Sequence, residues 1–139
     1  MPKITFTPPI YSFHIDFMGH VNNNVYIQWM EIGRHKIMDA IGMPVNEIAE
    51  TGFVPILAKT EISYLTPLFM GDRVRIEMWL SELRRASALI EFRFFNQDEI
   101  LAASGSQKGL FIDTVSQRPM RLNSEMRALF EKYLIENKE

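Results

Sequence analysis

One predicted helix constrains the fold more than any other part of the chain. Residues 23–41 carry apolar side chains at helical spacing, and the apolar surface covers more than half of the circumference. Such a helix cannot lie on a flat sheet with its back in water, so we expect it to be enclosed by a curved sheet or covered by a second subunit. The stripe that should face the core consists of Tyr26, Trp29, Met30, Gly33, Ile37, Ala40 and Ile41.

Both ends of this helix carry local signals. Asn22 or Asn23 can cap the first turn, because an asparagine side chain accepts a hydrogen bond from a free backbone N–H. Gly42 follows the last periodic residue, where many helices end. Gly33 lies in the middle of the core stripe, where glycine costs about 1 kcal/mol relative to alanine. We therefore expect the backbones of helix and sheet to approach closely at Gly33.

Four strands are predicted after the helix from alternation with a period of two. The first covers residues 54–66, the next two have inward rows at 74–80 and 88–94, and the last, rich in small residues, covers roughly 100–113. One face of the first strand should carry Val54, Ile56, Ala58, Thr60, Ile62 and Tyr64. These four consecutive strands are expected to pair as antiparallel meanders.

The ends of the chain complete the predicted architecture. Residues 4–15 favour an edge strand, and an amphipathic closing helix contains Met126, Phe130 and Leu134, with Asn123 or Ser124 as its cap. The expected fold class is α+β, with a five-stranded antiparallel sheet around one long central helix and a C-terminal helix. Such a sheet leaves an open edge and a half-covered helix, so a homodimer is expected.

Composition excludes several classes of protein. A length of 139 residues fits one domain, 1–139, and a net charge of −2 with scattered Lys and Arg argues against nucleic-acid or membrane-surface binding. The absence of cysteine excludes disulfides and a nucleophilic thiol. No signal-like run and no apolar stretch of about 18 residues is present, so a cytoplasmic location is expected. The three histidines lack metal-binding spacing, and no metal site is predicted.

The stretch from Asp16 to Arg34 resembles the hotdog-fold acyl-CoA thioesterases, in particular the 4-hydroxybenzoyl-CoA thioesterase-like branch. The matching residues are Asp16, Gly19, His20, Val21, Asn22, Asn23, Tyr26, Trp29, Glu31 and Arg34. A second match, residues 62–72 with Tyr64, Pro67 and Gly71-Asp72, lies where that branch has a Y..P...GD segment. The Gly-His-Val-Asn-Asn run is also similar to that of acyl-carrier-protein thioesterases. His14 departs from the pattern, because many members have a first aspartate there.

The resemblance implies a hydrolytic site at the start of the central helix. It assigns the Asp16 carboxylate as nucleophile or as general base for water, and the backbone N–H of Asn23 as oxyanion donor, aided by Gly19 or His20. A helix N-terminus suits this role because it offers free N–H groups and about half a positive charge. Judged by residue type alone, Asp16 is a turn residue and the asparagines are ordinary caps.

Further residues are candidates for substrate contacts. The resemblance places Glu31 near the acyl group, although a solvated helix face or a pair with His35 would also explain it. Thr60 lies on the strand that should run beside the site in a partner subunit, and Asn22 and Tyr26 flank the helix start. The phosphates of coenzyme A need cations, for which Arg84, Arg85, Arg93 and Lys108 at the sheet rim are candidates.

These observations lead to one main hypothesis and two alternatives. The chain is expected to be an acyl-CoA thioesterase without a separate cofactor, forming homodimers that assemble to tetramers or hexamers. Hydrolysis of acyl groups on acyl carrier protein is the nearest alternative, with a basic patch of Arg73, Arg75, Arg84 and Arg85 for the acidic carrier. The other is a non-catalytic acyl-CoA-binding protein.

Overall fold

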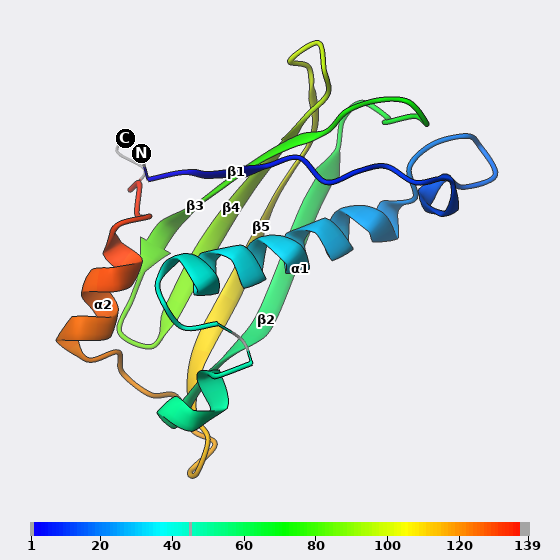
Figure 1. Cartoon of the computed structure of the whole chain (residues 1–139). Coiled ribbons are helices and arrows are strands. Elements are labelled where there is room, and N and C mark those ends of the chain that lie inside the picture. The colour runs from blue at the N-terminus through cyan, green and yellow to red at the C-terminus, as the bar shows by residue number, and fades with distance from the viewer. Residues whose placement is uncertain (1, 45, 137–139) are drawn as a thin grey trace.

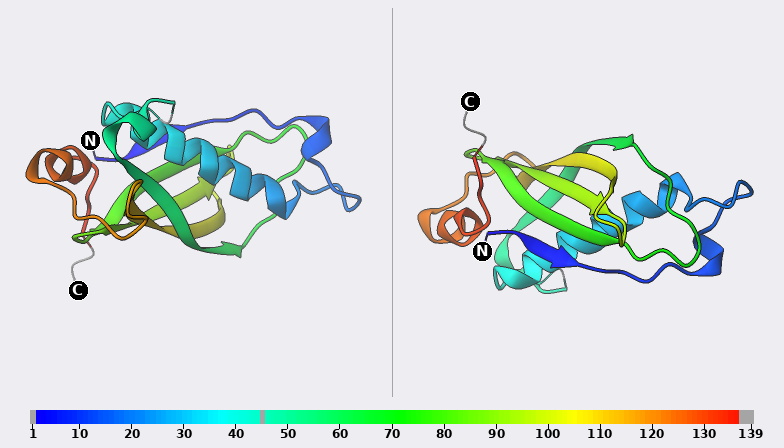
Figure 2. Two further views of the ribbon diagram at one scale, coloured as in Figure 1. Left: turned by 90° about the horizontal axis from the view of Figure 1, so that it is seen from below. Right: turned by 90° about the horizontal axis from the view of Figure 1, so that it is seen from above.

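The computed structural model describes residues 2–44 and 46–136. A five-stranded antiparallel sheet curves beside one long helix, α1 (Asn23–Ala40), which crosses a face of the sheet (Figures 1 and 2). The strands are β1 (Ile4–Phe6), β2 (Phe53–Tyr64), β3 (Arg75–Leu83), β4 (Ser87–Phe95) and β5 (Leu101–Asp113). A shorter helix, α2 (Ser124–Glu131), and two 3₁₀ turns, Ser12–His14 and Ile48–Thr51, complete the chain. The predicted α+β fold is confirmed.

The strand order is β1-β3-β4-β5-β2, which corrects the expected meander. β3, β4 and β5 pair consecutively, but β2 pairs with β5 at the far edge, from Phe53 opposite Asp113 to Tyr64 opposite Ala103. The connection 65–74 passes the end of the sheet, where the N–H groups of residues 65 and 66 both donate to the carbonyl of Ala102. Alternation reports which side of a strand faces the core and not which strand lies next to it, so the prediction was wrong here.

A β-bulge between Leu57 and Lys59 divides β2 into two halves. Beyond the bulge Thr60 lies opposite the buried Gln107, as the predicted inward row requires. Before it, Pro55 lies opposite the buried Phe111, so Val54 and Ile56 are out of phase with Thr60. The predicted single row from Val54 to Tyr64 is therefore wrong, because one extra residue exchanges the two faces of a strand.

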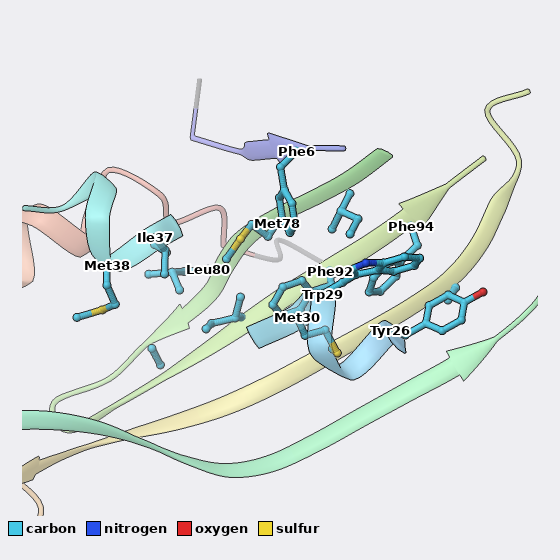
Figure 3. Close-up of a cluster of buried hydrophobic side chains, with 14 of the residues drawn as sticks. Phe6, Tyr26, Trp29, Met30, Ile37, Met38, Met78, Leu80, Phe92 and Phe94 are labelled. Atoms are coloured by element: carbon cyan, nitrogen blue, oxygen red, sulfur yellow. The ribbon is translucent and has the colours of Figure 1, made fainter. Parts of the chain in front are cut away.

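α1 begins and ends where its local signals predict. The Asn22 side chain accepts a hydrogen bond from the N–H of Asn24 at 3.0 Å, and Gly42 follows the helix with a φ of 82°. The buried residues of α1 are Val25, Tyr26, Trp29, Met30, Gly33, Ile37 and Met38. Ala40 of the predicted stripe is exposed, and Met38 is buried instead. Figure 3 shows Trp29 and Met30 beside Phe92 and Phe94 of β4.

Two glycines allow α1 and the sheet to approach closely. A Cβ on Gly33 would lie 2.9 Å from both Met78 Sδ and Phe92 Cε1. A Cβ on Gly105 of β5 would lie 2.8 Å from the carbonyl oxygen of Glu61 and 2.9 Å from Met30 Cε. The close approach expected at Gly33 is confirmed, and the small residues of β5 serve the same purpose.

α2 packs at the end of the sheet (Figure 1). The Asn123 side chain caps it by accepting a hydrogen bond from the N–H of Met126 at 2.8 Å, and Phe130 is buried against Phe111. Arg127 connects α2 to β3 by donating to the carbonyl of Leu83 at 3.1 Å. Of the helices in residues 2–44 and 46–136, none is both long and apolar enough to cross a membrane.

Candidate active site

A tight turn from Asp16 to His20 precedes α1. The N–H of Gly19 donates to the carbonyl of Asp16 at 3.0 Å, and Gly19 takes a φ of 82°, which glycine adopts without strain. Asp16 Oδ1 accepts hydrogen bonds from the N–H groups of Met18 at 2.9 Å and His20 at 3.1 Å. The other carboxylate oxygen, Oδ2, accepts no hydrogen bond from the described part of the chain. Asp16 thus shapes the turn with one oxygen and leaves the second free.

The first turn of α1 leaves one donor free beside this carboxylate. Asn24 N–H is capped by the Asn22 side chain, and Val25 N–H donates to the Asn22 carbonyl at 2.9 Å. The N–H of Asn23 has no acceptor within residues 2–44 and 46–136. The N–H groups of Gly19 and His20, expected as auxiliary donors, already donate to Asp16.

One hollow of about 210 Å³ brings most of the predicted catalytic residues together. Asp16, His20, Asn23 and Tyr26 line it, and Asn22 caps the adjoining helix. Tyr64, which the sequence analysis did not include among the site residues, lines the same hollow and donates through its hydroxyl to the Asn23 carbonyl at 3.2 Å. Its position as the first residue of the Y..P...GD segment was the sequence signal that could have identified Tyr64 as a site residue.

Aromatic side chains pack around this hollow. The ring of Tyr26 packs edge-on against that of Tyr64 at 5.2 Å, and burial raises the pKa of Tyr26 to about 12, against the opposing effect of the Leu68 backbone N–H. The phenol is therefore neutral under ordinary conditions. The imidazole of His20 packs edge-on against Phe69 at 5.1 Å. Only the backbone of His20 contacts the Asp16 carboxylate by a described hydrogen bond, so His20 supports the turn.

His14 holds the segment that leads into the turn. Its Nδ1 accepts a hydrogen bond from the N–H of Tyr11 at 3.0 Å, and its carbonyl accepts one from the N–H of Asn22 at 2.8 Å. Its ring packs edge-on against Trp29. His14 therefore makes the local contacts that fix the entry to α1.

Glu31 and Thr60 are not brought to Asp16 within one chain. Glu31 is eight positions beyond Asn23 on the exposed face of α1, about 12 Å along the axis, and the described residues show no ion pair between it and His35. Thr60 Oγ1 accepts a hydrogen bond from Gln107 Nε2 at 3.2 Å on β5. Glu31 lines a second cavity, between the C-terminal half of α1 and strands β2 and β5.

Four arginines surround a hollow at the β3–β4 turn. Arg84 and Arg85 were predicted, and Arg121 and Arg127, which the sequence analysis missed, join them from the segment around α2. Lys108 is exposed on β5, where it lies opposite Leu89 of β4 and Lys59 of β2. No local pattern connects these arginines, which are brought together by the packing of α2.

The basic patch expected for an acidic carrier is divided. Arg75 begins β3 and Arg84 follows its last residue, so the two are nine residue steps, or about 30 Å, apart along the strand. Arg75 also forms ion pairs with Glu77 and Glu99. Arg73 and Arg75 therefore cannot form one patch with Arg84 and Arg85 in a single chain, which corrects that expectation.

Across residues 2–44 and 46–136, His, Asp and Glu side chains form no group of three or more that could hold a metal ion.

Solved structures of thioesterases share the arrangement of one long helix across this curved sheet. The DHNA-CoA thioesterase from Staphylococcus aureus superimposes with a TM-score of 0.82 at 20% identity, over 94% of this chain and 88% of that one. A thioesterase from Thermus thermophilus, complexed with coenzyme A and Zn, gives a TM-score of 0.79 at 26% identity, over 94% and 92%. The chain has the hotdog fold.

The particular family follows from sequence comparison. The model of the thioesterase-like superfamily matches residues 13–130, and the chain belongs to this family. The chloroplastic acyl-acyl carrier protein thioesterase ATL2 of Arabidopsis thaliana is 32% identical over 122 residues, which are 86% of this chain and 63% of that protein. The chain thus spans a little under two thirds of this relative's length.

Proposed function

We propose that the chain hydrolyses acyl thioesters in the hollow at the start of α1. The observation that carries this proposal is the pairing of a free carboxylate oxygen, Asp16 Oδ2, with a free helix N-terminal donor, the N–H of Asn23, on the wall of one hollow. Hydrolysis requires these two complementary groups.

The Asn23 N–H binds the carbonyl oxygen of the thioester and stabilises the negative charge that develops on it. Because Oδ1 is held by two N–H groups, Oδ2 is directed to one position. Oδ2 either attacks the carbonyl carbon or removes a proton from an attacking water. In both roles the C–S bond breaks and the sulfur leaves as a thiolate that takes up a proton. If Oδ2 is the nucleophile, the acyl group forms a mixed anhydride with Asp16, which water then hydrolyses to the free acid and the regenerated carboxylate. If Oδ2 is the base, water adds directly to the carbonyl carbon and supplies the second oxygen of the acid.

Coenzyme A is the proposed thiol carrier. Arg84, Arg85, Arg121 and Arg127 line one hollow, and guanidinium groups bind phosphates through paired hydrogen bonds. Arg127 already donates to the carbonyls of Leu83 and Arg84 and pairs with Glu131, so Arg84, Arg85 and Arg121 are the proposed phosphate ligands. The likeness to ATL2, named as an acyl-acyl carrier protein thioesterase, favours the carrier protein as a second candidate. Rates on matched CoA and carrier-protein thioesters decide between them, and a non-catalytic binder releases no thiol from either.

A second copy of the chain is proposed to cover the edge of β2. Ile56 and Leu57 of β2 are 46% and 41% exposed, and Ile32 of α1 is 41% exposed. Glu31 of α1 lines the same cavity as Ile56 and Leu57, so the two exposed surfaces adjoin. Pairing two β2 edges antiparallel satisfies their open backbone groups.

This pairing would bring residues of a second subunit to the site. A two-fold axis near the middle of β2 places the Tyr64 end of one strand beside the Phe53 end of the other. Residues 54–57 of the partner subunit, and Glu31, which lines the same cavity, then approach the Asp16 hollow. In this register Thr60 lies opposite the partner's Leu57, so its role beside the site stays a prediction.

Replacement of Asp16 by asparagine tests the proposed chemistry. The amide oxygen of the new side chain would still accept both N–H groups, so Asp16→Asn should fold with an unchanged Tm while kcat falls by about a thousandfold or more. Thiol release from acyl-CoA thioesters gives the rate, and Asp39→Asn, which changes an exposed carboxylate in the last turn of α1, is the control. Wild-type turnover by Asp16→Asn contradicts the mechanism.

A further inference from the structure

The second cavity, between α1, β2 and β5, encloses about 260 Å³. Its walls are mostly apolar and include Ile37, Met38, Ile48, Ile90, Phe111 and Phe130. A cavity of about 150 Å³ holds benzene, so this one has room for a substituted aromatic ring or a medium alkyl chain. It does not have room for both such an acyl group and a nucleotide. The size and lining fit an acyl group.

Two charged side chains, the carboxylate of Glu31 and the guanidinium of Arg34, line this mostly apolar cavity. Arg34 Nη1 donates to Gln107 Oε1 at 2.7 Å, and no carboxylate of the described residues lies within ion-pair distance of Arg34. Burial lowers the pKa of Arg34, and the negative charge of Glu31 opposes this effect. A guanidinium has five N–H donors and no acceptor, so most of its donors remain for another partner.

The orientation of Arg34 is set by its neighbours. Gln107 is fully buried, and its Nε2 donates to Thr60 Oγ1 at 3.2 Å, which directs its Oε1 toward Arg34. This chain of hydrogen bonds crosses from α1 through β5 to β2. It holds the guanidinium at the cavity without neutralising its charge, as a preorganised donor requires.

We propose that Arg34 binds an oxygen atom on the acyl group of the substrate, remote from the thioester. The substrate class is then acyl thioesters that carry a carboxylate or hydroxyl oxygen at the far end of a short or aromatic acyl group. This inference rests on the proposed function and on the proposed pairing of β2 edges. An entirely hydrocarbon acyl chain would leave the Arg34 donors without a partner in an apolar space, which is unfavourable.

The pairing of subunits explains how an acyl group reaches this cavity. Within one chain Arg34 lies eleven residues beyond Asn23, about 16 Å along α1. In the proposed dimer, residues 54–57, which line the cavity, approach the Tyr64 end of the partner's β2. The acyl group held at Asp16 of one subunit therefore enters the cavity of the other.

Matched substrates test the proposal. The first pair is adipoyl-CoA and hexanoyl-CoA, and the second is 3-(4-hydroxyphenyl)propanoyl-CoA and 3-phenylpropanoyl-CoA, so that the two arms separate carboxylate from hydroxyl recognition. We expect the wild-type protein to favour the oxygenated member of at least one pair by about tenfold or more in kcat/KM, the size of a charge-assisted hydrogen bond. Arg34→Met should bring that ratio near one.

Controls separate recognition from folding. Lys36→Met removes a cation from the other side of the same helix, where Lys36 lies over Phe6, and should leave the ratio unchanged. Arg34→Lys keeps the positive charge but loses the paired N–H donors of the planar guanidinium, so it should retain part of the preference. It replaces Arg34→Met as the test variant if Arg34→Met does not fold. An Arg34→Met protein that folds with an unchanged ratio overturns the proposal, as does a wild-type protein without preference in either pair.

A binding measurement distinguishes this proposal from the proposed function. Free adipate and 3-(4-hydroxyphenyl)propanoate are titrated calorimetrically into wild type and Arg34→Met. If no thioester is hydrolysed but Arg34→Met weakens binding of either acid by about tenfold, the hydrolytic function fails and the assignment of Arg34 stands. Equal binding of both acids by the two proteins overturns the assignment of Arg34.

Discussion

The hydroxyl of Tyr64 donates to the backbone carbonyl of Asn23 at 3.2 Å, which joins the last residue of β2 to the first residue of α1. This hydrogen bond thus links β2, the edge strand at the proposed subunit interface, to the start of α1, where the free N–H of Asn23 lies. We therefore expect Tyr64 to position the Asn23 N–H, the proposed oxyanion donor.

Tyr64→Phe should lower kcat by about three- to tenfold, because one hydrogen bond worth about 0.5–1.5 kcal/mol no longer holds the helix start. KM should change little. Thiol-release kinetics of Tyr64→Phe and of the control Tyr11→Phe, whose ring is half exposed, provide the comparison. Unchanged kcat in Tyr64→Phe would show that the bond has no positioning role.

Ile32→Arg should separate the proposed dimer while leaving each subunit folded. Ile32 is exposed in the single chain, so the substitution should not disturb its fold. In the dimer, the two-fold axis would bring the substituted arginines of both subunits into the interface, where their charges would lose water without gaining partners. Analytical ultracentrifugation should show a monomer, and kcat should fall because each site loses its partner's residues. Val115→Arg, at a residue 91% exposed, should leave both properties unchanged. A fully active monomer contradicts the shared site.

Replacing both Arg84 and Arg85 by alanine should raise KM for acyl-CoA by about tenfold or more with little change in kcat. The reason is that these side chains line a hollow away from Asp16 and are proposed to contact only the phosphates. Acyl-N-acetylcysteamine, which lacks the nucleotide, should be hydrolysed equally well by both proteins. An equal loss on both substrates would instead indicate structural damage around α2.

Gly33→Ala should lower the free energy of unfolding by about 1–2 kcal/mol. Crowding of the new methyl against Phe92 and Met78 at 2.9 Å outweighs the gain of about 1 kcal/mol in helix propensity. Gly105→Ala should cost more, since the backbone oxygen of Glu61 cannot move away. Urea unfolding measures both, with Gly109→Ala, whose Cβ would meet its nearest neighbour at 3.9 Å, as the control.

The buried phenol of Tyr26 should make the protein less stable in alkali. An unfolded tyrosine releases its proton near pH 10, whereas burial raises the pKa of Tyr26 in the native protein to about 12. Above pH 10 the unfolded state therefore binds fewer protons, and stability falls as the pH rises toward 12. Between pH 9 and 11.5 the wild type should lose about 1–2 kcal/mol more than Tyr26→Phe in parallel unfolding titrations. Identical pH profiles would contradict the shift.

Much of the local structure was predictable because it depends on nearby residues. The limits of α1 follow from the cap at Asn22 and the glycine at position 42, and the close approach at Gly33 follows from a helix-breaking residue on an apolar stripe. The family motif likewise located the turn at Asp16. The inward row of β2 failed at the bulge beside Leu57, because a single inserted residue leaves no mark on the composition of the strand.

The sequence by itself thus determined most of the elements, most of the buried face of α1 and the place of the turn, since backbone preference and side-chain spacing are properties of a short segment. Only the tertiary structure decided that β2 joins β5, that Tyr64 supports Asn23, and that Arg121 and Arg127 join Arg84. These pairings link residues far apart in the chain. They depend on which surfaces fit together once the core is packed. The free energy of that packing comes from contacts between distant segments, so no local sequence pattern predicts it.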